Sequence, residues 1–167
     1  MLRLAKPWAL SFQHDERGDK VIDRSFIGFE MEPFEAPLEI GQMRLFAQAL
    51  GEQGSIYVDE KVALAQGFSS IVALPTFLIC LGTRDDLTYR LFDQLGIELS
   101  KLLHGEQEFV LERTVCAGEI LVGRKKVVDI YDKKNGALEF LVTEITYHDQ
   151  HERFVGSDRS TFVIKNK

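Results

Sequence analysis

Apolar positions in the first half of the chain recur with the period of a helix. Residues 43–50 carry one apolar face, at i, i+3, i+4 and i+7: Met43, Phe46, Ala47 and Leu50. Gly41 introduces this helix, and Gly51 stands where a glycine commonly ends one. A second, short helix is predicted at residues 59–66, with Asp59 as its N-cap and Gly67 as its end.

Residues 71–82 are apolar on every side, which is typical of a helix buried in the core. Pro75 fits the first turn of such a helix, where its missing N–H is not needed. This segment is therefore predicted to be the central helix of the domain. Residues 84–100 are more polar and are expected to form a helical or irregular connection.

From Glu106 onward the pattern changes to the alternation of strands, as where Phe109 and Leu111 alternate with Glu108 and Glu112. Three further strands are predicted, at residues 120–131, 137–147 and 153–164. Asn135-Gly136 indicates a type I′ hairpin between the first two of these three. Residues 138–142 are apolar on both faces, so that strand is predicted to be central and covered on both sides.

The predicted order is an extended segment at residues 30–37 that leads to a short strand, a helix, a buried helix and four antiparallel strands. One apolar helix wrapped by a long antiparallel sheet is an α+β layered arrangement. The 167 residues suit a single domain. We expect residues 28–167 to form this domain and residues 1–27 to be an N-terminal extension.

Composition and charge exclude several functions. The net charge of −6 argues against nucleic-acid binding, which needs a basic face. The densest basic run, residues 124–126 with Lys133 and Lys134, is either a solvated hairpin edge, the favoured interpretation, or a docking site for an anionic carrier. Cys80 and Cys116 are read as small buried hydrophobic residues rather than a disulfide. No apolar run reaches membrane-spanning length and no secretion signal is evident, so a cytoplasmic protein is expected.

Three sequence blocks resemble one known family. Residues 51–59 read Gly-Glu-Gln-Gly-Ser-Ile-Tyr-Val-Asp and lead into residues 67–77; residues 103–109 contain His-Gly-Glu-Gln; residues 113–119 end in Ala-Gly-Glu. Together they resemble the MaoC-like hydratases and dehydratases of acyl thioesters, in particular the FAS1-like N-terminal type. That type includes the non-catalytic half of peroxisomal multifunctional-enzyme hydratases and the non-catalytic subunit of mycobacterial hydroxyacyl-carrier dehydratases. The resemblance covers about residues 28–164 and implies the hot-dog fold.

The chain departs from the family at the positions that carry the chemistry. The family pattern G-D-x-N-P-x-H-x-D places a catalytic water with Asp and His, whereas this chain has Glu52 and Tyr57 there. A phenol holds its proton until about pH 10 and imidazole only until about 6.5, so tyrosine is a poor base. Pro75 stands where the family has a glycine whose N–H stabilises the thioester oxygen, and proline has no N–H to donate. We therefore expect no complete active site in this chain.

Other candidate residues are weaker. The resemblance implies that the acyl group borders the buried helix at Pro75, Thr76, Phe77 and Leu81, although an apolar helix face is more often simple core. His104 is a weak candidate for a replacement base, because its block recurs in non-catalytic relatives and favours a structural role. His148 and His151 lack the partners of a zinc site, so no metal and no cofactor are expected.

Three hypotheses follow. The chain is the non-catalytic, acyl-binding subunit of a hydratase/dehydratase, paired with a MaoC-like catalytic partner. Alternatively, it is a stand-alone hot-dog enzyme, either a hydratase that uses Glu52 and His104 or a thioesterase that uses Glu52. As a third possibility, it is a non-enzymatic acyl-CoA-binding module. In each case the expected partners are an acyl-CoA or acyl-carrier-protein ligand and a second hot-dog, in a homodimer or a heterodimer, with no nucleic acid and no membrane.

Overall fold

The computed structural model describes residues 21–166, and the description below is confined to them. Its elements include short 3₁₀ turns, labelled η, as well as α-helices and strands. They follow one another as η1 (Arg24–Phe26), β1 (Phe34–Pro37), α1 (Ile40–Ala49), α2 (Glu60–Ala65), η2 (Pro75–Phe77), α3 (Leu78–Gly82), η3 (Arg84–Asp86), α4 (Leu87–Gln94), η4 (Leu99–Lys101), β2 (Leu102–Leu111), β3 (Ile120–Lys133), β4 (Leu138–His148) and β5 (Phe154–Lys165).

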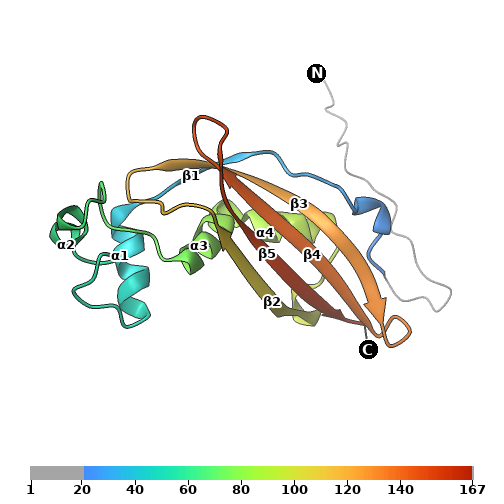
Figure 1. Cartoon of the computed structure of the whole chain (residues 1–167). Coiled ribbons are helices and arrows are strands. Elements are labelled where there is room, and N and C mark those ends of the chain that lie inside the picture. Colours follow the sequence, from blue (N-terminus) through green and yellow to red (C-terminus); the bar gives the residue numbers. More distant parts are fainter. Residues whose placement is uncertain (1–20, 167) are drawn as a thin grey trace, which may run out of the picture.

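The five strands form one antiparallel sheet in the order β1-β3-β4-β5-β2. The helices α3 and α4 lie along one face of this curved sheet, and α1 and α2 project beyond one end of it (Figure 1). The α+β arrangement predicted from the sequence is confirmed. Among the helices of residues 21–166, none has the length and apolar character that a membrane span requires.

The strand β4 lies in the middle of the sheet, as its apolar sequence predicted. Its alternate residues Leu141, Thr143, Ile145 and Tyr147 are buried against the helices. The other face of β4 carries Phe140, whose ring stacks on Tyr131 at 4.7 Å between centroids. No helix of the described region covers that face (Figure 1), so the expected cover on both sides is found on one side only.

The hairpin between β3 and β4 is present, but its loop is longer than the two residues of a type I′ turn. Lys133 and Leu138 are the last paired residues, which leaves residues 134–137 in the loop. Lys134, Asn135 and Gly136 all have positive φ angles, of 53°, 55° and 78°. The Asn-Gly signal thus marked the hairpin correctly and misplaced the turn by one residue, because Lys134 also takes the left-handed conformation.

The central helix is shorter than predicted. Residues 71–74 are extended rather than helical: Ala73 N donates to Val115 O at 2.9 Å, and Ala117 N donates to Ile71 O at 2.9 Å. Helical geometry starts only at Pro75, because the ring of a proline disfavours helical ψ in the preceding residue, and Leu74 has ψ 141°. The helical part is nevertheless buried, with Phe77, Leu78 and Leu81 at 1% exposure or less.

The two helices before it end as the sequence predicts, and α2 also begins as predicted, whereas α1 begins at Ile40, so that Gly41 lies inside it rather than before it. Gly51 follows α1 with φ 90°, and Gly67 follows α2 with φ 88°, both in the left-handed region that glycine favours. The Asp59 side chain caps α2 by accepting hydrogen bonds from the backbone N–H groups of Lys61 and Val62. Of the two cysteines, Cys116 is buried and Cys80 is half-buried, and both are free thiols.

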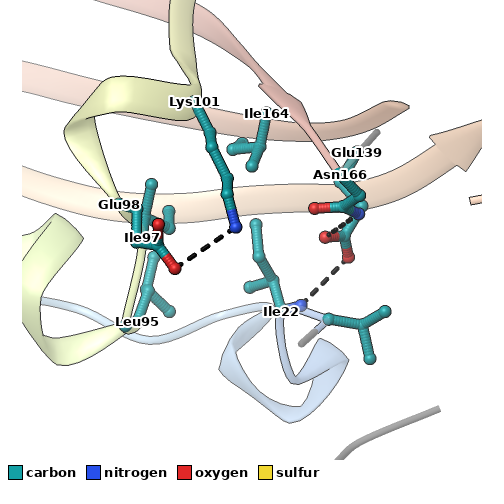
Figure 2. Close-up of a pocket in the computed structure, with 10 residues that line it drawn as sticks. Ile22, Leu95, Ile97, Glu98, Lys101, Glu139, Ile164 and Asn166 are labelled. Atoms are coloured by element: carbon teal, nitrogen blue, oxygen red, sulfur yellow. Dashed lines mark hydrogen bonds and ion pairs between the residues drawn. The ribbon is translucent and has the colours of Figure 1, made fainter. Parts of the chain in front are cut away.

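The first described residues already pack against the sheet. Ile22 is buried, and its N–H donates to Glu139 Oε1 at 3.0 Å, while Asn166 Nδ2 donates to Glu139 Oε2 at 2.9 Å (Figure 2). The small hollow beside these residues has a volume of about 20 Å³, which suits about one water molecule and no organic ligand. The boundary at residue 28 stays a prediction, and residues 1–20 lie outside the described region.

Candidate functional site

The family dyad positions lie in the segment that joins α1 to α2, beyond the end of the sheet (Figure 1). Glu52 and Tyr57 are both half-buried. Neither side chain makes a hydrogen bond or ion pair with another residue of the region 21–166, although the Glu52 N–H donates to Ala47 O and the Tyr57 N–H to Ser55 Oγ. Within residues 21–166, no hydrogen bond or ion pair therefore fixes the orientation of the carboxylate or the phenol.

The residues expected beside the acyl group divide into two kinds. Pro75 and Thr76 begin the 3₁₀ turn η2 and are exposed. Phe77 and Leu81 are fully buried in the core formed with β3, β4 and the Val115 segment. Because Pro75 occupies the first position of the turn, no N–H is available there. A role for these four residues in acyl binding stays a prediction.

His104 lies far from the dyad positions. It pairs with Phe162 near the beginning of β2. Tyr57 lies near the other end of the sheet, because the carbonyl of the preceding residue, Ile56, accepts the Val72 N–H at 3.0 Å. Leu111, at the far end of β2, is seven residue steps from His104, which corresponds to roughly 23 Å along the strand. The chain thus does not bring Glu52 and His104 together. The His104 Nε2 lies 2.9 Å from Gln107 Oε1 instead.

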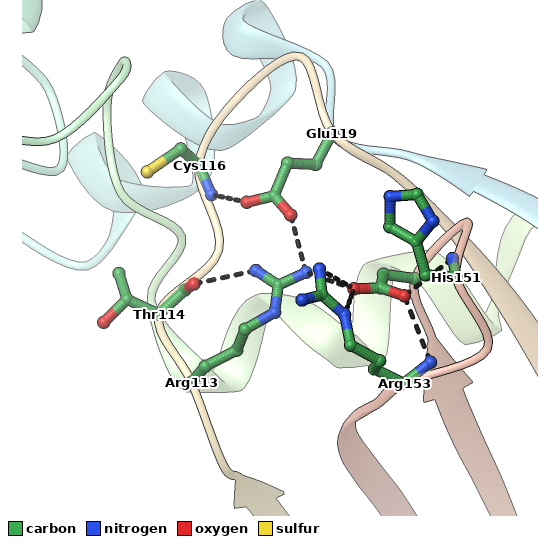
Figure 3. Close-up of polar contacts among 7 residues, drawn as sticks. Arg113, Thr114, Cys116, Glu119, His151 and Arg153 are labelled. Carbon is green, nitrogen blue, oxygen red and sulfur yellow. Dashed lines mark hydrogen bonds and ion pairs between the residues drawn. The ribbon is translucent and has the colours of Figure 1, made fainter.

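The Ala-Gly-Glu block, residues 117–119, takes part in a cluster of polar contacts through Glu119 (Figure 3). Glu119 Oε1 accepts the Cys116 N–H at 2.7 Å, and Glu119 Oε2 pairs with Arg113 at 2.7 Å. Asp149 joins this cluster from the β4–β5 turn: its Oδ2 pairs with Arg153 at 2.7 Å and its Oδ1 accepts the His151 N–H at 2.8 Å. The Arg153 hydrogen bond lowers the pKa of Asp149 to about 2. The cluster holds two turns together.

The histidines of the predicted H-x-x-H pair are not arranged as metal ligands. His148 Nδ1 lies 3.1 Å from an Arg124 guanidinium nitrogen, and His151 enters the Asp149 cluster through its backbone. Across residues 21–166, no group of three or more histidine, cysteine or carboxylate side chains is placed to hold a metal ion.

A cavity of about 240 Å³ lies between the helices and the inner face of the sheet. One wall comes from α3 and α4 and the other from the strands β2, β3, β4 and β5. Most of its lining is apolar, with Ile79, Phe92 and Phe162 among the contributors. Gly82 lets α3 approach the sheet here, because a Cβ atom on it would stand 2.5 Å from Ile145 Cδ1.

Charged and polar side chains converge on this cavity from the sheet. Lys125 and Asp158 are 3% and 4% exposed, respectively. Lys125 Nζ donates to Thr88 Oγ1 on α4 at 2.7 Å. The Gln107 side-chain amide donates to Asp158 Oδ1, and Ser160 Oγ lies 2.9 Å from Gln107 Oε1.

Burial shifts the titration of both charged groups. It lowers the pKa of Lys125 to about 8, against the attraction of Asp158, which favours the charged amine. Burial also raises the pKa of Asp158, opposed by the Gln107 hydrogen bond and by the charge of Lys125. Each ion thus lowers the cost of burying the other.

The sequence interpretation missed these residues and placed Lys125 on a solvated edge with its neighbours. That prediction is wrong for Lys125, while Arg124 is half-buried and Lys126 is exposed. The alternation of β3 contained the signal, since Leu121, Lys125 and Val127 share the parity of the buried face. A charged residue at a position whose side chain points into the core is unusual, and it indicates a buried ion-pair or hydrogen-bond partner or a functional site.

Comparison with known proteins places this architecture in a family. The model of the FAS1-like dehydratase domain region matches residues 25–157. A UPF0336 protein of Saccharopolyspora erythraea is 31% identical over 147 residues, which cover 86% of this chain and 92% of that protein. The HadBC (3R)-hydroxyacyl-ACP dehydratase complex of Mycobacterium tuberculosis superimposes with a TM-score of 0.71 at 22% identity, over 83% of this chain and 96% of that one. A MaoC-like dehydratase superimposes with a TM-score of 0.70 at 20% identity, over 85% of this chain and 43% of that one.

The sheet wrapped on a short buried helix is thus the hot-dog fold, as predicted. The chain belongs to the family defined by the FAS1-like dehydratase domain region.

Proposed function

We propose that this chain is the non-catalytic, acyl-binding subunit of an acyl-thioester hydratase or dehydratase, and that the acid–base pair resides on a MaoC-like partner. The observation that carries the proposal is the state of the dyad positions. Glu52 and Tyr57 stand at the positions of the family's Asp and His, but their side chains have no polar partner within residues 21–166. Reversible hydration needs a base, an acid and an oxyanion donor. At the family positions for these roles, the chain has two side chains without an orienting partner in the described region and a proline without an N–H, which supports the proposal.

The surface supports association with a second chain. Leu45, Leu50 and Leu64, on and after the projecting helices, are 69%, 60% and 54% exposed. Exposed leucines on the two helices that flank the dyad segment support a surface that packs against another protein. The HadBC structure is itself a complex of dehydratase subunits.

The edge strand β2 offers a second contact. Within residues 21–166 it is a ten-residue strand paired only with β5, and its exposed side chains include Leu103 and Val110, at 49% and 43% exposure. A long, partly apolar edge without proline invites pairing with another strand. In the proposed complex the partner covers this edge or the leucine surface and supplies the catalytic water.

The division of labour defines what each chain contributes. The partner transfers protons and holds the thioester oxygen of an acyl-CoA or an acyl-carrier protein. This chain provides apolar walls for the acyl group and stabilises the partner's fold. Binding of remote substrate parts raises the rate when it positions the reacting carbons, so a subunit without a base still affects turnover.

The test compares the purified chain, a MaoC-like partner from a neighbouring gene, and their complex in hydration of short and long trans-2-enoyl-CoA. The chain alone is expected to be inactive and the complex to be active. Robust hydration by the chain alone, lost in Glu52→Gln, contradicts the proposal.

Two further readouts separate the other hypotheses. Release of free thiol from saturated acyl-CoA by the chain alone identifies a thioesterase. Native mass spectrometry of the co-expressed pair shows whether a stable complex forms; a chain that binds acyl-CoA without a catalytic partner is a binding module instead.

A further inference from the structure

The cavity under α3 and α4 combines an apolar lining with two buried charges of opposite sign. Lys125 and Asp158 lie in one row of the sheet, on β3 and β5, with Ile145 of β4 paired between them. Two inter-strand spacings put their backbones about 10 Å apart. Both point to the inner face, and Ile145 keeps them from forming a direct ion pair.

Each of the two charged groups keeps hydrogen-bonding capacity toward the cavity. An ammonium group has three N–H donors, and Thr88 accepts one from Lys125. The side-chain hydrogen bonds that Asp158 makes within residues 21–166, from Gln107 and Ser160, both end on Oδ1. Its Oδ2 lies on the side of Gly82, which also lines the cavity, at 3.6 Å from the position of a Cβ there.

We propose that this cavity binds an apolar chain that carries a hydroxyl group, with Lys125 donating a hydrogen bond to the hydroxyl oxygen and Asp158 Oδ2 accepting a hydrogen bond from the hydroxyl. The volume sets the size of the ligand. A cavity of about 150 Å³ holds benzene, so about 240 Å³ holds a chain of roughly nine non-hydrogen atoms. The aromatic rings of Phe92 and Phe162, 4.9 Å apart between centroids, line the apolar part.

The charges select the hydroxyl over other polar ends. A carboxylate pairs with Lys125 but is repelled by Asp158, and an amine pairs with Asp158 but is repelled by Lys125. Either end also adds a third charge to a buried site, which costs affinity. A ketone accepts from Lys125 but donates nothing to Asp158. A hydroxyl group is both donor and acceptor, so it satisfies both residues without adding charge.

The site links to the proposed function through its neighbourhood. The cavity borders α3, the helix that the family resemblance places beside the acyl group. Its assignment to an acyl chain hydroxylated away from the thioester rests on the proposed function, whereas the binding site itself does not. The mouth, where exposed Thr83, Tyr89 and His104 stand, admits a ligand from solvent or from a partner chain.

The experiment titrates the full chain with 1-octanol, octanoate and octylamine at pH 7, using isoleucine methyl NMR as the readout. The methyl signals of Ile79 and Ile145, which line the cavity, are expected to shift, and that of Ile71, buried in the neighbouring core, to stay in place. 1-Octanol is expected to bind at least tenfold more tightly than the other two. Equal or tighter binding of octanoate or octylamine, or shifts at Ile71 alone, overturns the proposal.

Variants locate the polar contact. Lys125→Met and Asp158→Asn are each expected to weaken 1-octanol binding about tenfold, the loss of one buried charged hydrogen bond. Lys126→Met, next in sequence but exposed and paired with Glu30, is the matched control and is expected to leave affinity unchanged. An equal effect of both lysine variants contradicts the site. Because no partner or turnover is involved, the result does not depend on whether the hydratase assay succeeds.

Discussion

At the scale of single residues, the features that define this molecule are charges in unusual places. Lys125 sits in the buried phase of β3 beneath α4, and its amine is held by Thr88. Replacing a hydrophobic residue by lysine at such a position carries a desolvation cost that Asp158 only partly offsets. Because this cost lowers the pKa of Lys125, the pH dependence of stability tests whether its amine is buried.

The stability of the protein is expected to depend on pH through Lys125. Burial lowers its pKa from 10.5 to about 8, so between these values the unfolded chain holds more protons than the folded one. Unfolding free energy therefore rises with pH across this window. Relative to Lys125→Met, the wild type is expected to gain on the order of 2–3 kcal/mol from pH 7 to pH 10. Chemical denaturation at several pH values measures it, and a parallel profile for both proteins contradicts the assignment.

Asp149 is expected to act in the opposite pH range. Its hydrogen bonds to Arg153 and to the turn lower its pKa from 3.8 to about 2, so the folded state favours the carboxylate. The stability it contributes is present above about pH 4 and is lost as the pH falls toward 2. Asp149→Asn is therefore expected to be less stable than wild type at pH 6, with the two converging near pH 2 in urea titrations. A constant difference over this range contradicts the ionic role.

At the scale of elements, the sequence predicted most of the architecture. The caps at Asp59, Gly51 and Gly67 and the alternation of β3 to β5 are local signals, and the structure confirms them. The start of the central helix was missed because residues 71–74 are apolar enough for either a helix or a strand, although Pro75 disfavours helical ψ in the residue before it. Their extended form depends on pairing with residues 115–117, far away in sequence.

The candidate site was predictable only in part. The dyad positions followed from sequence spacing, but Lys125, Asp158 and Gln107 reach one cavity only after four strands, β2 to β5, are aligned in register. His104 was singled out, and the structure places it at the mouth of the cavity, beside Gln107 rather than Glu52.

The pairing of β2 with β5 is expected to depend on Gly156. A Cβ atom there would stand 2.4 Å from Val110 O, a backbone atom that has no side-chain freedom to move aside. Gly156→Ala is therefore expected to destabilise the fold by about 2–3 kcal/mol. Gly41→Ala is the control, since nothing lies within 4 Å of its Cβ position. Thermal unfolding of both variants checks this, and equal melting temperatures contradict the close approach.

At the scale of the whole molecule, the proposed function makes this chain one half of a composite enzyme. The family dyad positions lie between α1 and α2, beyond one end of the sheet, where these helices carry exposed leucines. The polar cavity lies between the sheet and the helices α3 and α4. The two are separate regions of one domain, which suits a subunit that contacts a partner with one and a ligand with the other.

The projecting helices are expected to be the partner surface. Leu45→Glu and Leu64→Glu change exposed side chains, so each variant is expected to fold normally and to weaken complex formation by tenfold or more. Leu99→Glu, at a residue 54% exposed on η4, serves as the matched control. Co-purification and sedimentation measure the effect. A complex that tolerates both changes places the interface elsewhere, with the β2 edge as the next surface to test.

The most direct test of the central claim is the hydration rate of the assembled complex when this chain carries Tyr57→Phe. The substitution removes only the hydroxyl at the family's histidine position. We expect the rate on trans-2-enoyl-CoA to stay within about twofold of wild type, while loss of the partner's own histidine abolishes it. A fall of a hundredfold or more with Tyr57→Phe contradicts the account and assigns the chemistry to this chain.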